Sequence, residues 1–82
     1  MISTQYRVRL DLKYETPGDK AECRLEKCHA ALYPVNALSV ESFDGMAAVG
    51  AAPYIEVVVE DIKQAERIES QLKKIIGRWL DA

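Results

Sequence analysis

The segment YRVRLDLKYE, residues 6–15, alternates apolar and polar side chains over its whole length. Successive side chains of a β-strand point to opposite faces, so this period of two predicts a strand with one apolar and one polar face. The apolar row consists of Tyr6, Val8, Leu10, Leu12 and Tyr14, and the polar row of Arg7, Arg9, Asp11, Lys13 and Glu15. Such a strand belongs to a sheet that is covered on one side, with a solvated face of mixed charge on the other.

Two segments carry apolar residues at helical spacing and are expected to cover that sheet. The first follows TPGDK, where Thr16 can cap a helix, Pro17 suits the first helical position and Asp19 occupies the capping-box position. Its predicted buried stripe is Ala21, Leu25, Cys28 and Leu32. The second helix is expected to begin at the cap Asp61 and to end at Gly77. Its predicted stripe is Ile62, Ala65, Ile68, Leu72, Ile75 and Ile76.

The remaining segments predict further strands. VNALSVESF, residues 35–43, and YIEVVVE, residues 54–60, are separated by the turn signal Asp44-Gly45. RWLDA, residues 78–82, fits either a short last strand or a continuation of the second helix. The order predicts an α+β protein of ferredoxin-like type, a βαββα(β) sandwich with an antiparallel sheet and two helices on one face.

Composition limits the size and the class of the protein. A chain of 82 residues buries one core, so residues 1–82 are expected to form a single domain. The 11 basic and 13 acidic residues give a net charge of −2, and we do not expect nucleic acid as a partner, although small patches such as Lys73, Lys74 and Arg78 exist. There is neither a signal peptide nor an apolar run of roughly 20 residues, so we expect a cytoplasmic protein without a membrane segment.

Reactive side chains gather only at Cys23, Cys28 and His29. Residues five apart on a helix lie about 140° around its axis, so the two cysteines are poorly placed to share a metal or to form a disulfide. The single histidine has no nucleophile motif around it. We therefore expect no catalytic residue, no metal site and no cofactor.

Three segments taken in order resemble an ACT domain: TPGDKA, PVNALSVESFDG and IEVVVEDIKQAERIESQLKKIIG. ACT domains are small regulatory modules of amino-acid metabolism and of the stringent-response synthetase-hydrolases. The last segment is similar to regulatory subunits of acetolactate synthase. The resemblance implies a non-catalytic regulatory module that forms a homodimer or a higher oligomer, with a parent or partner enzyme and an amino acid as further partners.

Residue by residue, the resemblance implies ligand binding by Pro17, Gly18, Asp19 and Asn36, commonly at an interface between two copies. Amides at a helix start suit a carboxylate, and Asp19 suits an ammonium group. If a ligand binds, Asn36 is expected to face the loop of residues 17–19. The alternative is a structural subunit without a ligand, because the small β-α-β-β-α subunits of the tRNA-modifying KEOPS assembly have this length and order. Their last helix often ends in a sequence similar to RWL, residues 78–80.

Overall fold

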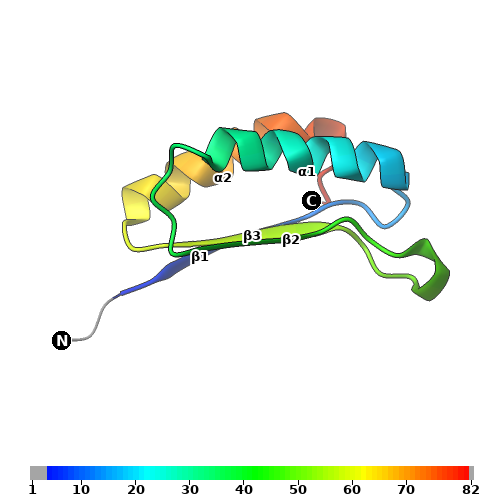
Figure 1. Cartoon of the computed structure of the whole chain (residues 1–82), viewed down its shortest axis with the longest axis horizontal. Helices are drawn as coiled ribbons and strands as arrows, with labels where there is room; N and C mark the ends of the chain where they lie inside the picture. The colour runs from blue at the N-terminus through cyan, green and yellow to red at the C-terminus, as the bar shows by residue number, and fades with distance from the viewer. Residues whose placement is uncertain (1–3, 82) are drawn as a thin grey trace.

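The computed structural model describes residues 4–81 as a three-stranded antiparallel sheet with two helices on one face (Figure 1). In chain order the elements are β1 (Tyr6–Asp11), α1 (Gly18–Leu32), β2 (Ser39–Phe43), the 3₁₀ helix η1 (Ala47–Val49), β3 (Tyr54–Val59), α2 (Ile62–Ile76) and the 3₁₀ turn η2 (Gly77–Trp79). The order of elements and the α+β class are as the sequence predicts. No helix in the described range is long and apolar enough to cross a membrane.

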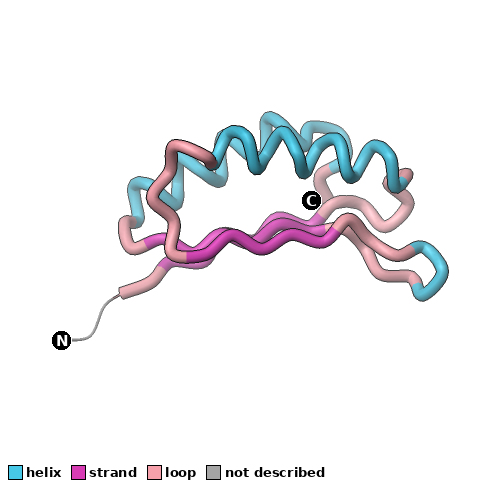
Figure 2. Tube along the Cα trace, in the orientation of Figure 1, coloured by secondary structure: helices cyan, strands magenta, loops and turns pink. Residues whose placement is uncertain are grey.

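The sheet has the order β1-β3-β2, so β3 is the central strand and β2 is an edge strand. Figure 2 shows the strands as one layer with both helices on the same side of it. Val8, Val57 and Val40 form one row across the three strands in this order. The alternation of β1 and β3 has the predicted effect, because Val8, Leu10, Ile55, Val57 and Val59 are all buried on the side of the helices. The predicted second strand is shorter than expected, since β2 begins only at Ser39.

Both helices complete the core as their spacing predicts, with one exception. The buried helical residues are Ala21, Leu25, Cys28 and Leu32 of α1 and Ala65, Ile68, Leu72 and Ile76 of α2. The predicted stripe of α2 wrongly included Ile62, whose side chain is 51% exposed. Ile62 is the first residue of α2 and precedes the four residues through which the helix packs on the core.

The two helix starts differ. Asp61 caps α2 as predicted, since its Oδ1 accepts a hydrogen bond from the Lys63 amide at 3.0 Å. Thr16 does not cap α1: the N-cap is Pro17, and no side chain caps it. The helix begins one residue later than predicted, with the first described bond running from the Ala21 amide to the Pro17 carbonyl at 2.9 Å. The predicted Thr16 cap and Asp19 capping box are therefore wrong.

The end of the chain lies beside β1. Gly77 has a φ of 60° and ends α2 as predicted, and η2 follows. Leu80 then forms an isolated antiparallel bridge with Leu12, supported by bonds from the Lys13 amide to the Trp79 carbonyl at 2.7 Å and from the Asp81 amide to the Asp11 carbonyl at 2.9 Å. The Leu12 amide instead bonds to Pro53, before β3. Alternate groups of a strand point to opposite sides, so residues 79–81 line the edge of β1 away from β3. Ala82 lies outside the described residues.

Candidate functional site

A small pocket lies where the sequence predicts the ligand-binding loop, at the start of α1. It has a volume of about 50 Å³, room for a few water molecules. Its lining is Tyr14, Thr16, Gly18, Asp44, Gly45, Met46, Ala51 and Pro53. Of the four predicted ligand-binding residues only Gly18 lines this pocket, while Pro17 and Asp19 are exposed beside it.

Thr16 is the unusual residue of this pocket. Its side chain is only 8% exposed, and its Oγ1 has no hydrogen-bond partner among the described residues. A buried hydroxyl without a partner costs about 1–3 kcal/mol, so such groups are rare in folded proteins. The sequence did not indicate this feature, because Thr16 has an ordinary explanation as a helix cap.

Asn36 lies far from that pocket within one copy of the chain. The loop of residues 17–19 begins α1, and Asn36 follows the end of the same helix. A helix of 15 residues is about 22 Å long at 1.5 Å per residue. The structure therefore does not bring Asn36 to Pro17, Gly18 and Asp19 in a single copy, contrary to the expected arrangement across one end of the sheet.

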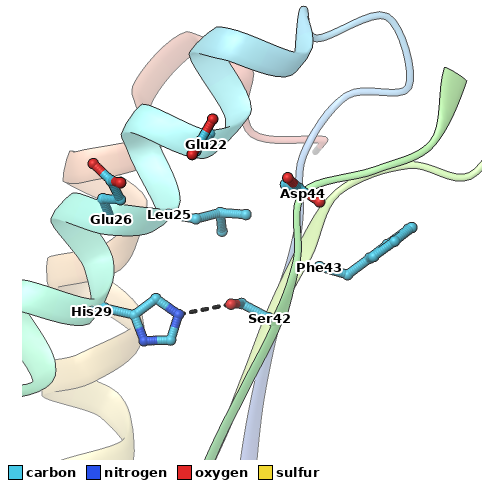
Figure 3. Close-up of a pocket in the computed structure, with 7 residues that line it drawn as sticks. All are labelled: Glu22, Leu25, Glu26, His29, Ser42, Phe43 and Asp44. Atoms are coloured by element: carbon cyan, nitrogen blue, oxygen red, sulfur yellow. Dashed lines mark hydrogen bonds between the residues drawn. The ribbon is translucent and has the colours of Figure 1, made fainter.

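A larger groove separates α1 from the edge strand β2 (Figure 3). Its volume is about 280 Å³, close to the lower end of small-molecule sites, about 300 Å³. Glu22, Leu25, Glu26 and His29 line it from α1, and Ser42, Phe43 and Asp44 line it from the end of β2. Three of the seven residues are carboxylates, which makes the groove acidic.

One hydrogen bond crosses the groove. His29 Nε2 lies 2.7 Å from Ser42 Oγ (Figure 3). Sequence reasoning missed this pair because the two residues belong to a helix and a strand with no shared motif. A serine nucleophile also needs a group that orients the histidine, and no hydrogen bond from another described side chain to the His29 ring is present. The bond joins α1 to the edge strand β2.

On the face of the sheet away from the helices, the arginines of β1 form ion pairs with neighbouring carboxylates. Glu56 contacts Arg7 at 2.9 Å and Arg9 at 3.4 Å, and Arg9 also contacts Asp11 at 3.3 Å. The Arg9 guanidinium lies 4.2 Å from the centre of the Tyr54 ring. These contacts pair the two arginines of β1 with carboxylates and agree with the solvated surface of mixed charge that the alternation predicts.

The cysteines differ in environment. Cys23 is exposed, whereas Cys28 is buried in the core, and burial raises the pKa of its thiol to about 11. Such a thiol stays protonated and behaves as a small apolar side chain. Residues 4–81 contain no group of three or more His, Cys, Asp or Glu side chains that could hold a metal ion.

Comparison with models of protein families, with curated proteins and with solved structures found no match to this chain.

Proposed function

We propose that this chain is a non-catalytic, ACT-like regulatory module that pairs with a second copy through β2 and binds an amino acid at a site completed by the partner. The observation that carries the proposal is the exposure of β2 on the side of the helices. In the row of Val8, Val57 and Val40, the first two are buried, whereas Val40 is 38% exposed. Leu38, on the same side, is 50% exposed. The apolar rows of the core thus extend beyond the cover that α1 and α2 provide.

The two edges of the sheet support pairing at β2 rather than at β1. Natural edge strands avoid pairing through charges, prolines or a covering segment. The edge of β1 carries Arg7, Arg9 and Asp11, and residues 79–81 cover its end. The strand β2 contains one charged residue, Glu41, and no proline. An antiparallel partner strand on β2 would continue the sheet and cover Leu38 and Val40.

A two-fold axis through Val40 gives the most favourable register. An axis through Glu41 would place two glutamates directly opposite each other, which destabilises a strand pair. An axis through Val40 sets Val40 against the partner's Val40 and Leu38 against the partner's Ser42. Such an interface is self-complementary, as two-fold symmetry requires.

Tyr33 supports the same axis. It directly follows α1, one helical turn beyond His29, and is 91% exposed. In Figure 1, α1 and β2 run in opposite directions. Because His29 contacts Ser42, Tyr33, about 6 Å further along the chain at 1.5 Å per residue, comes near the level of Val40, two residues before Ser42. The axis through Val40 therefore brings Tyr33 close to the partner's Tyr33, which would bury two large aromatic rings.

This register also completes the predicted ligand site. With the axis through Val40, Asn36 lies opposite the partner's Asp44. Asp44 lines the pocket at the start of α1 together with Thr16 and Gly18. Asn36 of each copy would then enclose the pocket of the other, and the site would join a helix start, a carboxylate and the buried Thr16 hydroxyl. A helix start suits the carboxylate of an amino acid, and Asp44 suits its ammonium group.

The end of the chain supports the ferredoxin-like fold and the ACT resemblance over the assembly alternative. Residues 79–81 lie where a fourth strand of a ferredoxin-like sheet belongs, beside β1 and away from β3. A structural subunit of the KEOPS type would extend its last helix through Arg78 and Trp79, whereas α2 ends at Ile76.

Sedimentation equilibrium tests self-association. The wild-type chain is expected to be a dimer, and Val40→Lys is expected to be a monomer, because the substitution places two ammonium groups at the axis. Val49→Lys is the matched control: the same change, on the exposed η1 loop, should leave the dimer intact. A strictly monomeric wild type at high concentration contradicts the proposal.

Thermal denaturation with each of the twenty amino acids tests ligand binding. One of them is expected to raise the Tm of the wild type, since ligand at 100 times its Kd adds about 2.7 kcal/mol. Asn36→Ala and Val40→Lys should both abolish the shift, one by removing the amide and the other by separating the copies. A dimer whose Tm responds to none of the twenty would be an assembly subunit without a ligand.

A further inference from the structure

The cations of this chain are unevenly distributed. Eight of the 11 basic residues lie in α1, α2 and η2, and for seven of these no described carboxylate comes within ion-pair distance. We call them the helix-layer cations: Lys20, Arg24, Lys27, Lys63, Arg67, Lys74 and Arg78. Of the other four, Arg7, Arg9 and Lys73 are ion-paired. The net charge of −2 is a sum over the whole chain and does not reflect this uneven distribution.

On α2 the cations follow one exposed line. Lys63, Arg67 and Lys74 fall within about 40° around the helix axis at 100° per residue. Arg67 and Lys74 flank Ser70 and Gln71 along one shallow depression of the surface. A second depression joins Lys63 and Arg67, and Asp61 is the one acid that lines it.

On α1 the cations lie on the side that faces α2. Lys20, Arg24 and Lys27 are spaced four and three residues apart, which places them within about 60° around the axis. Arg24 fixes the direction, since its Nη1 donates a hydrogen bond to the Ile75 carbonyl of α2 at 3.3 Å. The helix-layer cations of α1 thus adjoin those of α2. The acids Glu22 and Glu26 lie on the opposite flank of α1, in the groove beside β2.

The composition of this surface identifies the kind of partner. The outward positions of α2 between Lys63 and Lys74 are occupied by Glu66, Arg67, Ser70 and Gln71, with Glu66 as the one acid and without an apolar or aromatic side chain. Protein interfaces depend on buried apolar or aromatic anchors, whereas contacts to a phosphate backbone depend on cations and small polar groups.

We propose that the helix-layer cations form a sequence-independent docking surface for the phosphate backbone of double-stranded nucleic acid. From Lys63 to Lys74 the helix rises about 17 Å, the span of about five phosphates of one strand at 3.4 Å each. No exposed aromatic ring is available here for stacking on bases, since Trp79 is half-buried under Arg78, whose guanidinium lies 4.8 Å from the ring centre. A duplex should therefore bind more tightly than a single strand of the same length. This surface does not involve β2 and is independent of the proposed self-association.

Fluorescence anisotropy with a labelled duplex of about 20 base pairs tests the proposal, because affinity should fall with salt by about 0.9 log units per phosphate contacted. Arg67→Gln/Lys74→Gln should lower the affinity at least about tenfold in low salt and reduce the salt slope by about 2. Arg7→Gln/Lys13→Gln, with the same loss of charge near the sheet, should change the affinity less than about twofold. Circular dichroism verifies that both variants are folded, and Lys63→Gln/Lys74→Gln provides a second test of the surface.

Three results would overturn the proposal: no binding of the wild type in low salt, equal losses in the two charge-matched variants, or displacement of the duplex by polyglutamate as readily as by unlabelled duplex at equal charge. The last result would indicate an acidic protein as the partner instead. Loss of binding only in the helix-layer variants, with a single strand binding more weakly than the duplex, supports it.

Discussion

Val40 of β2 and Val57 of β3 lie side by side in register on the same face of the sheet, yet Val57 is fully buried and Val40 is not. The two helices cover β1 and β3 and leave the helix-facing side of the edge strand open. An apolar row that ends uncovered at an unprotected edge is the arrangement that a second copy completes. We therefore propose that two copies of this chain associate through β2.

The packing of the core predicts that two aliphatic residues of α2 contribute very differently to the free energy of unfolding. Leu72 is fully buried, so Leu72→Ala should lower the free energy of unfolding by about 2–5 kcal/mol through lost burial and a cavity. Ile62→Ala, at an exposed position of the same helix, should change it by less than about 0.5 kcal/mol. Urea denaturation monitored by circular dichroism measures both values, and similar losses at the two sites would contradict the described packing.

The side-chain cap of α2 gives a second prediction about stability. Asp61→Ala removes the oxygen that accepts the Lys63 amide and should cost about 0.5–2 kcal/mol. Asp61→Asn keeps an oxygen at the same place and should retain most of that stability. The pair of variants separates capping from the loss of charge, since both remove the carboxylate. Equal destabilisation in the two would show that the cap is not the source of the effect.

Thr16→Val tests the unpaired hydroxyl at the start of α1. Removal of a buried polar group that has no partner, with the shape retained, should leave the Tm of the ligand-free protein unchanged or raised. The same variant should weaken amino-acid binding if the hydroxyl contacts the ligand. A marked drop in the Tm of the ligand-free variant would mean that the hydroxyl is hydrogen-bonded in solution.

The two cysteines should differ in reactivity and in their effect on pH dependence. Near pH 8, Cys23 should react with iodoacetamide and Cys28 should not, and Cys23→Ser should remove the fast reaction. The folded-state pKa of Cys28 is about 11, above the ordinary thiol value of 9.0, because of burial. Its contribution to stability is thus present below pH 9 and declines as the pH rises to 11. Comparable alkylation rates at both thiols would contradict the burial of Cys28.

Periodicity in the sequence was sufficient to predict the elements that are covered on one side. The inward rows of β1 and β3 and the buried stripe of α1 follow from side-chain direction alone, which the backbone of each element fixes locally. The Glu69–Lys73 ion pair at 2.9 Å joins residues four apart on α2, so it also depends only on the local geometry of the helix.

The features that the sequence did not reveal depend on contacts between elements. The alternation of β2 gives the face on which Val40 lies but not whether a helix covers it. The His29–Ser42 bond joins two elements with no common motif. Thr16 changed from a predicted cap to a buried, unpaired group through a shift of one residue in the start of α1. Asn36 is separated from the loop of residues 17–19 by the length of α1. The resemblance was based on residue types along the chain, so it did not give the distance between these residues.

Disulfide cross-linking at the proposed two-fold axis is the sharpest test of pairing through β2. In a Cys23→Ser background, with Cys28 buried, Val40→Cys introduces the one exposed thiol of residues 4–81. Directly opposed residues of an antiparallel pair have Cβ atoms about 4.5–5.5 Å apart, within reach of a disulfide after small adjustment. Mild oxidation should convert Val40→Cys almost completely to a covalent dimer on a non-reducing gel, while Glu41→Cys in the same background, offset from the axis, should remain largely monomeric. A Val40→Cys protein that stays monomeric under oxidation, with a monomeric mass in sedimentation equilibrium, would rule out pairing through β2.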